Sequence, residues 1–370
     1  MTRKNILVPL IALSAILFGS WGNTGHYNIS QRAALSFNAQ MAQFAPWAEI
    51  LAAHASDADE RKSSDPDEGP RHYIDIDNYD TFNTSGRIPQ TLDSVIMIYG
   101  SSFVYDQGVL PWATLKSYDS LIACFTRQDW DKAVLFASDL GHYVADGHMP
   151  LHITRNYNGQ YTGNSGIHSR YETKMINAYI GQIAYNGTPA QMIENTGQYV
   201  FDYIYQNHIY VDSVLLADDY AKTFSTNTNS QAYKQALWEY SQGFTTVLFK
   251  NASHALADLI YSAWVEAGSP VISSEGLADN TATSMALQLQ NAPNPFSNET
   301  HISFTLADSR KVKLEVKNAV GQSIAVLADE NLAQGAYTNT WRSANYPSGI
   351  YFLLLQAGNE TAIRKMIVRD

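Results

Sequence analysis

The chain has 370 residues, of which 45% are hydrophobic and 16% are charged. This composition provides enough apolar side chains for a buried core and is unlike that of a disordered tail. Its 24 basic and 35 acidic side chains give a formal net charge of -11, so a broad basic face that binds duplex DNA is not expected. The single cysteine, Cys124, excludes an intramolecular disulfide and a cysteine-based zinc site. Histidines and carboxylates would therefore have to bind any metal ion.

The first twenty residues have the pattern of a secretory signal peptide. Arg3 and Lys4 precede an apolar run over residues 6–18, which ends at Gly19 and Ser20. An uncleaved anchor is the alternative, but a membrane-spanning helix needs roughly 20 apolar residues, and this run is shorter. We therefore expect residues 1–20 to be a signal peptide for the Sec pathway and Trp21 to become the first residue.

The remainder of the chain divides by its hydrophobic periodicity. Over residues 21–268 apolar and aromatic side chains recur at helical spacing, which predicts a mainly helical domain. Residues 269–291 are small and polar and predict a linker. Residues 292–370 alternate apolar and polar side chains between glycines, which predicts a small all-β sandwich. The acidity belongs to the first domain, where residues 21–268 carry 14 basic and 26 acidic side chains.

The densest group of chemically active side chains follows residue 140. His142 and Asp146 are four residues apart and so lie on one face of a helix, and His152 follows the helix-ending Gly147 and Pro150. A second pair at the same spacing, His168 and Glu172, comes shortly afterwards.

Further imidazoles and carboxylates precede this segment, at His26, Asp57, Asp59, His72, Asp75 and Asp77. Histidine and carboxylate together suit zinc, and so many ligands could hold more than one ion. A single pair of this kind is more often a hydrogen-bonded core pair, but two pairs with His152 between them favour a metal centre. The acidic stretch over residues 57–68 is expected to be a solvated loop, and composition alone does not choose between Asp57 and Asp59.

The order of these residues resembles the trinuclear zinc site of the zinc-dependent phospholipase C and single-strand-specific nuclease superfamily. The resemblance covers most of residues 21–268, and it implies that family's helical fold with a cleft holding three Zn²⁺ ions. The implied ligands are Trp21, His26, Asp59, His72, His142, Asp146, His152, His168 and Glu172.

The resemblance also assigns the ligands to ions. Asp59, His72, His142 and Asp146 would bind one zinc ion, and His152, His168 and Glu172 would bind a second. The third would be bound by the free amine and carbonyl of Trp21 with His26 and Asp146, so signal cleavage would be an activating step. A water shared by two zinc ions would attack phosphorus, with Asp59, Asp146 and Lys62 as catalytic residues.

The two branches of the superfamily leave different marks on the chain. Glu172 as the last ligand is similar to the phospholipase branch, whereas the short step from Trp21 to His26 and the His72-Tyr73-Ile74-Asp75 run resemble the nuclease branch. In that branch Tyr73 and Asp75 would bind a base, although Tyr73 is equally well explained as a packing residue. Lys62 lies where the nucleases have an arginine. A lysine cannot make the bidentate contact with a phosphate that an arginine makes, which argues against the nuclease branch. The balance favours a phospholipase C-like esterase acting on a phospholipid head group, with a single-strand endonuclease or 3'-nucleotidase as the alternative.

The C-terminal residues 292–370 resemble the sorting domain of the type IX secretion system. The resemblance is carried by Asn294-Pro295-Phe296, Gly335-Ala336-Tyr337, Ser348-Gly349-Ile350-Tyr351-Phe352 and a basic end at Arg364-Lys365. It implies a partner in that secretion machinery, a Bacteroidota-like source and a secreted or cell-surface location. A carbohydrate- or protein-binding sandwich is the competing interpretation. For the whole chain, the hypothesis from another class is a surface binding protein with structural zincs, and the sequence does not indicate the oligomeric state.

Overall fold

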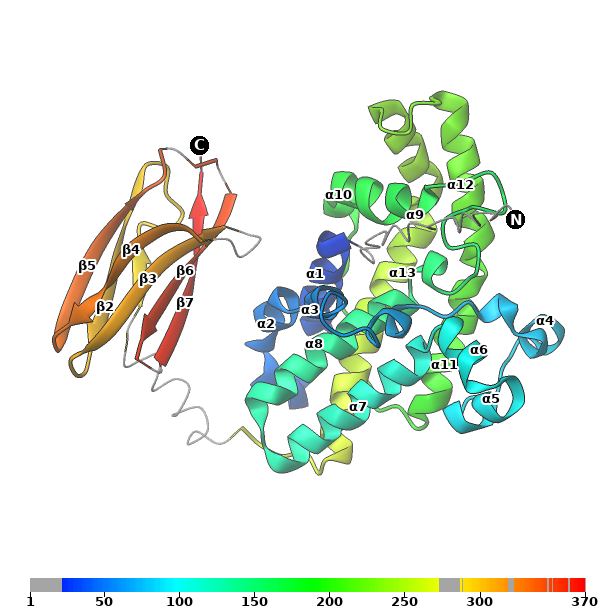
Figure 1. The fold of residues 1–370 in the computed structure, drawn as a ribbon, viewed down its shortest axis with the longest axis horizontal. Coiled ribbons are helices and arrows are strands. Elements are labelled where there is room, and N and C mark those ends of the chain that lie inside the picture. The colour runs from blue at the N-terminus through cyan, green and yellow to red at the C-terminus, as the bar shows by residue number, and fades with distance from the viewer. Residues whose placement is uncertain are drawn as a thin grey trace, which may run out of the picture. The chain divides into compact units, whose positions relative to one another are not determined.

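The computed structural model describes residues 22–272, 287, 289–318, 323–344, 346–347, 349–358 and 360–369. The chain separates into two compact units, with the boundary between Val271 and Ile272. Figure 1 shows that the first unit is built of helices and the second of β-strands. The expected signal peptide and Trp21 lie outside the described residues. Among the described helices, none is long and apolar enough to cross a membrane.

Within its described residues, 22–271, the helical unit contains six helices of twelve or more residues. They are α1 (Gly22–Ala33), α7 (Leu110–Arg127), α8 (Trp130–Gly147), α11 (Thr196–His208), α12 (Tyr210–Phe224) and α13 (Gln231–Glu266). The shorter helices are α2 (Trp47–Ala53), α3 (Asp57–Arg61), α4 (Asp80–Ser85), α5 (Leu92–Tyr99), α6 (Ser101–Asp106), α9 (Ile167–Ser169) and α10 (Ile176–Tyr179). Short 3-10 helices are η1 (Ala34–Ser36), η2 (Ala39–Phe44), η3 (Gly69–His72), η4 (Ile76–Asn78), η5 (Pro150–His152) and η7 (Ile180–Gln182), and η6 (Arg170–Met175) is a π-helix.

Helix α8 packs against four other helices, α1, α2, α7 and α13. The Asp129 side chain caps its start by accepting a hydrogen bond from the Lys132 amide. Its side chains enter two separate hydrophobic clusters, one through Tyr143 and the other through Ala145. The polar residues of the same helix therefore lie between two hydrophobic clusters.

Small residues let α1 and α8 approach closely. A Cβ atom at Gly141 would lie 3.1 Å from Ser30 Oγ of α1 and 2.8 Å from Leu256 Cδ2 of α13, so a larger side chain would push α8 away from both helices. Ser30 is four residues after His26, and Gly141 immediately precedes His142. This close approach brings the two imidazole rings together.

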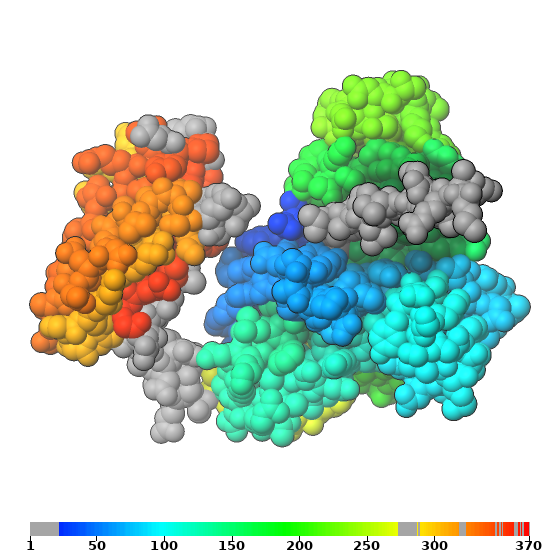
Figure 2. Space-filling view, in the orientation of Figure 1, coloured from blue at the N-terminus to red at the C-terminus, as the bar shows by residue number. Residues whose placement is uncertain are grey.

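A lobe of short helices lies at one edge of the helical unit, where α4, α5 and α6 are visible in Figure 1 and in the space-filling view of Figure 2. Its buried side chains include Tyr79, Val95 and Val104. The chain leaves α6 through Gly108, whose φ of +86° is a left-handed conformation that favours glycine. A Cβ there would lie 2.2 Å from the Tyr73 carbonyl oxygen.

The described strands of the second unit form two antiparallel sheets. The three-stranded sheet has the order β1-β2-β5 and the four-stranded sheet has the order β4-β3-β6-β7. Their bounds are β1 Gln290–Ala292, β2 Glu299–Leu306, β3 Arg310–Asn318, β4 Ser323–Leu332, β5 Gly335–Arg342, β6 Gly349–Ala357 and β7 Glu360–Val368. Both sheets contribute to one apolar cluster that contains Phe304, Leu314 and Trp341. The predicted order of a mainly helical unit followed by a small β-sandwich is confirmed.

Candidate metal centre

The structure brings eight of the nine predicted ligands together. Three groups have ligand atoms within 4.8 Å of one another: His26, His142 and Asp146; Asp59, His72 and His142; and His152, His168 and Glu172. We call them the His26 group, the His72 group and the His168 group. The ninth predicted ligand, Trp21, lies outside the described residues.

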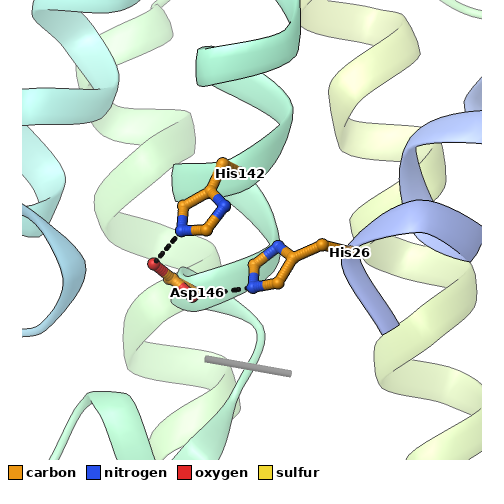
Figure 3. A group of neighbouring side chains, drawn as sticks. All are labelled: His26, His142 and Asp146. Atoms are coloured by element: carbon orange, nitrogen blue, oxygen red, sulfur yellow. Dashed lines mark ion pairs between the residues drawn. The ribbon is translucent and has the colours of Figure 1, made fainter. Parts of the chain in front are cut away.

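The His26 group joins α1 to α8 and is drawn in Figure 3. The rings of His26 and His142 stack at a centroid distance of 3.9 Å, and both face Asp146. Asp146 Oδ1 lies 3.5 Å from His26 Nε2, and Oδ2 lies 3.3 Å from His142 Nε2. All three side chains are fully buried.

The His72 group is connected to the first group through His142. His72 Nδ1 lies 2.9 Å from His142 Nε2, 3.0 Å from Asp146 Oδ2 and 3.6 Å from Asp59 Oδ1. Asp146 therefore faces ligands of both groups. Its Oδ1 also lies 3.3 Å from His152 Nδ1, which places the third group next to the other two.

The His168 group brings together the end of η5, helix α9 and the π-helix η6. His168 in α9 and Glu172 in η6 are four residues apart, and His168 Nε2 lies 3.1 Å from Glu172 Oε2. His152 Nε2 lies 3.3 Å from His168 Nε2. Insertions of the π type inside helices are often found at functional sites.

Hydrogen bonds, several of them to backbone groups, hold the His72 and His152 segments side by side. The His152 ring nitrogen Nδ1 is 2.8 Å from the His72 carbonyl oxygen, and the Ile74 amide donates to the His152 carbonyl at 2.8 Å. The Asp77 carboxylate then accepts from the Thr154 hydroxyl and the Arg155 amide. This pairing fixes the separation of two groups that are eighty residues apart in the chain.

Three of the histidines have the same ring orientation. Nδ1 of His142, His152 and His168 lies 2.7, 2.8 and 3.0 Å from the carbonyl oxygens of Ala55, His72 and Tyr157. A carbonyl can only accept, so Nδ1 carries the proton in the neutral ring and the lone pair is on Nε2. All three Nε2 atoms face the cluster, which is the arrangement expected of metal ligands.

The charges in the cluster influence one another strongly. Burial opposes protonation of His142 and His152, but neighbouring carboxylates, Asp146 first, outweigh it and raise the pKa of His142 to about 9 and of His152 to about 10. The same contacts hold the pKa of Asp146 well below its usual range despite its burial. His26 differs, because burial and the adjacent His142 lower its pKa to about 3. A neutral His26 has a lone pair free for a metal ion.

Buried polar atoms without hydrogen bonds test whether a metal fits here. Among the described residues, both ring nitrogens of His26, Nε2 of His72, Oδ1 of Asp146 and Oε2 of Glu172 are buried without a hydrogen-bond partner. Such atoms are costly to bury unless something satisfies them. Those of His26, Asp146 and Glu172 converge on neighbouring imidazole and carboxylate groups, a donor set that suits zinc. The residues present therefore fit divalent metal ions.

The two candidate aspartates near residue 58 have separate roles. Asp59 lies at the cluster, 3.7 Å from His142 Nε2, whereas Asp57 pairs with His54 at 2.7 Å. Lys62 Nζ lies 2.6 Å from Asp59 Oδ1. The side chains of Asp59 and Lys62 are 14% and 20% exposed, so the cluster approaches solvent at these two residues.

Tyr73 and Asp75 lie beside the cluster on the segment that follows His72. The Tyr73 hydroxyl donates to the Asp106 carbonyl at 3.4 Å. The side chains of Tyr73 and Asp75 are both half-buried. Burial, with a contribution from Asp77, raises the pKa of Asp75 to about 7. No hydrogen bond or ion pair to the Asp75 carboxylate occurs among the described residues.

Glu68 is a residue that the sequence interpretation missed. The expectation of a solvated acidic loop is wrong at this position, because Glu68 is fully buried. Burial alone would raise its pKa, but the adjacent His72 ring, the hydrogen bond donated by Tyr143 and the charge of Arg61 hold that pKa below its usual range. The spacing of Glu68 four residues before His72 is the sequence signal that could have identified it.

Comparisons with known proteins support the assignment of the C-terminal unit. Residues 292–369 match the family described as the secretion system C-terminal sorting domain, which confirms the predicted type IX sorting domain. This match supports export by that system to the cell surface or extracellular space. No curated protein matched the sequence.

Two solved structures of clostridial toxins are similar to the chain. The alpha toxin from Clostridium absonum is 11% identical, with a TM-score of 0.42, over 95% of this chain and 96% of that chain. The Clostridium perfringens alpha-toxin from avian strain SWCP is 12% identical, with a TM-score of 0.41, over 95% and 99%. These low values carry no argument about function, which is inferred below from the side chains.

Proposed function

We propose that the helical unit is a zinc-dependent hydrolase of phosphoric diesters that is exported by the Sec pathway and then by the type IX system. The observation that carries this proposal is the convergence of the three histidine and carboxylate groups around Asp146. Three Zn²⁺ ions would occupy them, with the Trp21 amine and carbonyl completing the His26 group. Bound zinc would lower the pKa of water towards neutrality and offset the charge of a phosphate.

The residues around the cluster have separable tasks. Asp146 would hold two of the groups in register, because its two oxygens face different histidines. Asp59, at the more exposed side of the cluster, would accept a proton from the attacking water. Lys62 is a point charge beside Asp59 that could contact a phosphate oxygen.

A phospholipid head group is the proposed substrate, on the strength of Glu172 as the last ligand. Single-stranded nucleic acid or a 3'-nucleotide is the second candidate substrate. One observation on Asp75 and Tyr73 supports it. The Asp75 carboxylate lacks a hydrogen-bonding partner among the described residues and lies near the half-buried ring of Tyr73. An aromatic ring and an acceptor beside a phosphate site could bind a base.

The proposal is tested with bis(p-nitrophenyl) phosphate as the substrate and zinc content recorded. His142→Ala is expected to remove turnover and to lower the zinc content, because His142 belongs to two of the three groups. His54→Ala is the matched control, since His54 pairs with Asp57 away from the cluster. A folded, zinc-loaded wild-type protein without diester turnover would favour the alternative of a surface binding protein with structural zincs.

Parallel assays identify the substrate branch. Release of diacylglycerol from phosphatidylcholine micelles without cleavage of single-stranded DNA or 3'-AMP would support the phospholipase assignment and make Tyr73 and Asp75 packing residues. Cleavage of the nucleotides would identify Tyr73 and Asp75 as the base site and overturn that assignment.

A further inference from the structure

A buried carboxylate lies behind the His72 ring, on the side away from the cluster. Glu68 Oε1 is 3.3 Å from His72 Nε2 and accepts a hydrogen bond from the Tyr143 hydroxyl. Glu68 Oε2 lies 3.3 Å from Arg61 Nε and 2.7 Å from Arg71 Nη1. Among the described residues His72 Nε2 makes no hydrogen bond, although Glu68 Oε1 lies within reach of it.

His72 differs from the other oriented histidines of the cluster. His142, His152 and His168 direct Nδ1 at a backbone carbonyl and Nε2 at the cluster. His72 is reversed, because its Nδ1 lies 2.9 Å from His142 Nε2 and 3.0 Å from Asp146 Oδ2. Binding a cation through Nδ1 requires the neutral ring to carry its proton on Nε2. The group that faces Nε2 is Glu68.

We propose that Glu68 is a positioning residue, which holds the proton of His72 on Nε2 and presents the Nδ1 lone pair to the metal ion of the His72 group. The inference rests on the proposed zinc centre. A carboxylate that accepts the second ring proton of a metal-ligating histidine fixes the ring and raises the basicity of its other nitrogen. Loss of such a partner typically reduces metal affinity about 10- to 100-fold.

The competing role for Glu68 is that of an ion-pair partner alone. Arg61 also pairs with Asp139 at 3.0 Å, and Arg71 also pairs with Asp65 at 3.2 Å. Asp139→Asn therefore weakens the same buried charge network at Arg61 without removing the acceptor beside His72 Nε2. It is the matched control for substitutions of Glu68.

The first test measures zinc affinity in the full chain by competition with a chromogenic chelator. Glu68→Gln keeps an oxygen that can accept the Nε2 proton and is expected to weaken one ion about 10-fold, while Glu68→Leu weakens it about 100-fold. Asp139→Asn should bind all ions within about twofold of the wild type, because no ligand changes its orientation. Equal losses in Glu68→Gln and Asp139→Asn would overturn the inference.

The second test reads the His72 tautomer directly and does not depend on the folding of Glu68→Leu. Long-range proton-nitrogen NMR correlations of the histidine rings in the zinc-loaded wild type should show a protonated Nε2 in His72 and a protonated Nδ1 in His142, His152 and His168. A protonated Nδ1 in His72 would overturn the inference. If the wild type binds zinc and both Glu68 variants bind it with the same affinity, this inference alone is refuted. If the wild type binds no zinc, the metal centre is refuted as well.

Discussion

Because the two oxygens of Asp146 face different groups, a substitution of Asp146 should reduce zinc binding more than a substitution of a ligand that belongs to one group only. Oδ1 lies 3.5 Å from His26 Nε2, and Oδ2 lies 3.0 Å from His72 Nδ1 and 3.3 Å from His142 Nε2. Asp146→Asn keeps the shape of the side chain and removes its charge. We expect this variant to retain one zinc ion, in the His168 group, and to lose the two others.

The size of the expected loss of zinc affinity follows from the burial of the Asp146–His142 ion pair. Asp146 and His142 are both fully buried, and removing one member of a buried ion pair costs about 3–5 kcal/mol. If that loss falls on metal binding, the affinity at the affected groups decreases about 100- to 1,000-fold or more. Glu172→Gln is the matched control, because Glu172 faces His152 and His168 of one group.

Elemental analysis after gel filtration checks both variants. The expected contents are one zinc ion per chain for Asp146→Asn and two for Glu172→Gln. Far-ultraviolet circular dichroism confirms that each variant is folded. Equal zinc contents in the two variants would refute the claim that Asp146 is shared between groups.

Three further predictions concern the surroundings of the site. Gly108→Ala should lower the free energy of unfolding by about 3 kcal/mol or more, because left-handed strain adds to a clash with the Tyr73 carbonyl. Asp75→Asn should stabilise the protein by about 2 kcal/mol more at pH 8 than at pH 4, a figure reduced for the partial exposure of Asp75. Chelation of zinc should lower the Tm, because metal binding to a site that is absent from the unfolded chain contributes folding free energy.

The controls for these predictions come from the same chain. Gly100 has a φ of +85° but nothing within 4 Å of an added Cβ, so Gly100→Ala should cost only the strain of about 1–2 kcal/mol. Equal costs at Gly100 and Gly108 in urea unfolding would contradict the clash argument. A Tm unchanged by chelation would count against structural coupling of the metal ions.

The sign of the Asp75 effect follows from its raised pKa. The unfolded carboxyl releases its proton near pH 4, whereas the folded one retains it to about pH 7. Stability is therefore lost as the pH rises from about 4 to 7, and the asparagine variant does not suffer this loss. Stability curves of the two proteins that remain parallel from pH 4 to pH 8 would show that Asp75 titrates normally.

The parts of the site that were predicted from the sequence depend on local spacing. His142 and Asp146, and His168 and Glu172, are four residues apart, so any helical conformation places each pair on one face. The type IX sorting domain was recognised from short motifs in the same way, and the family match confirms it.

The parts that were missed depend on contacts between distant segments. The burial of Glu68 results from Arg61, Arg71 and Tyr143 closing around it, and composition indicated only an acidic stretch. The pairing of the His72 and His152 segments is also a tertiary contact, and the backbone groups that take part in it carry no sequence signal. The π-helix around Glu172 was also missed. It keeps His168 and Glu172 on the same side, as an α-helix would, and it does not change the spacing of the hydrophobic residues in the sequence.

The most direct test of the central claim is a zinc titration of chelator-treated protein that starts at Trp21, with diester hydrolysis as the readout. The account predicts no turnover without zinc and activity that saturates at three zinc ions per chain. Turnover that is independent of zinc, or a fully loaded protein that hydrolyses neither phosphatidylcholine, nucleotides nor bis(p-nitrophenyl) phosphate, would contradict it.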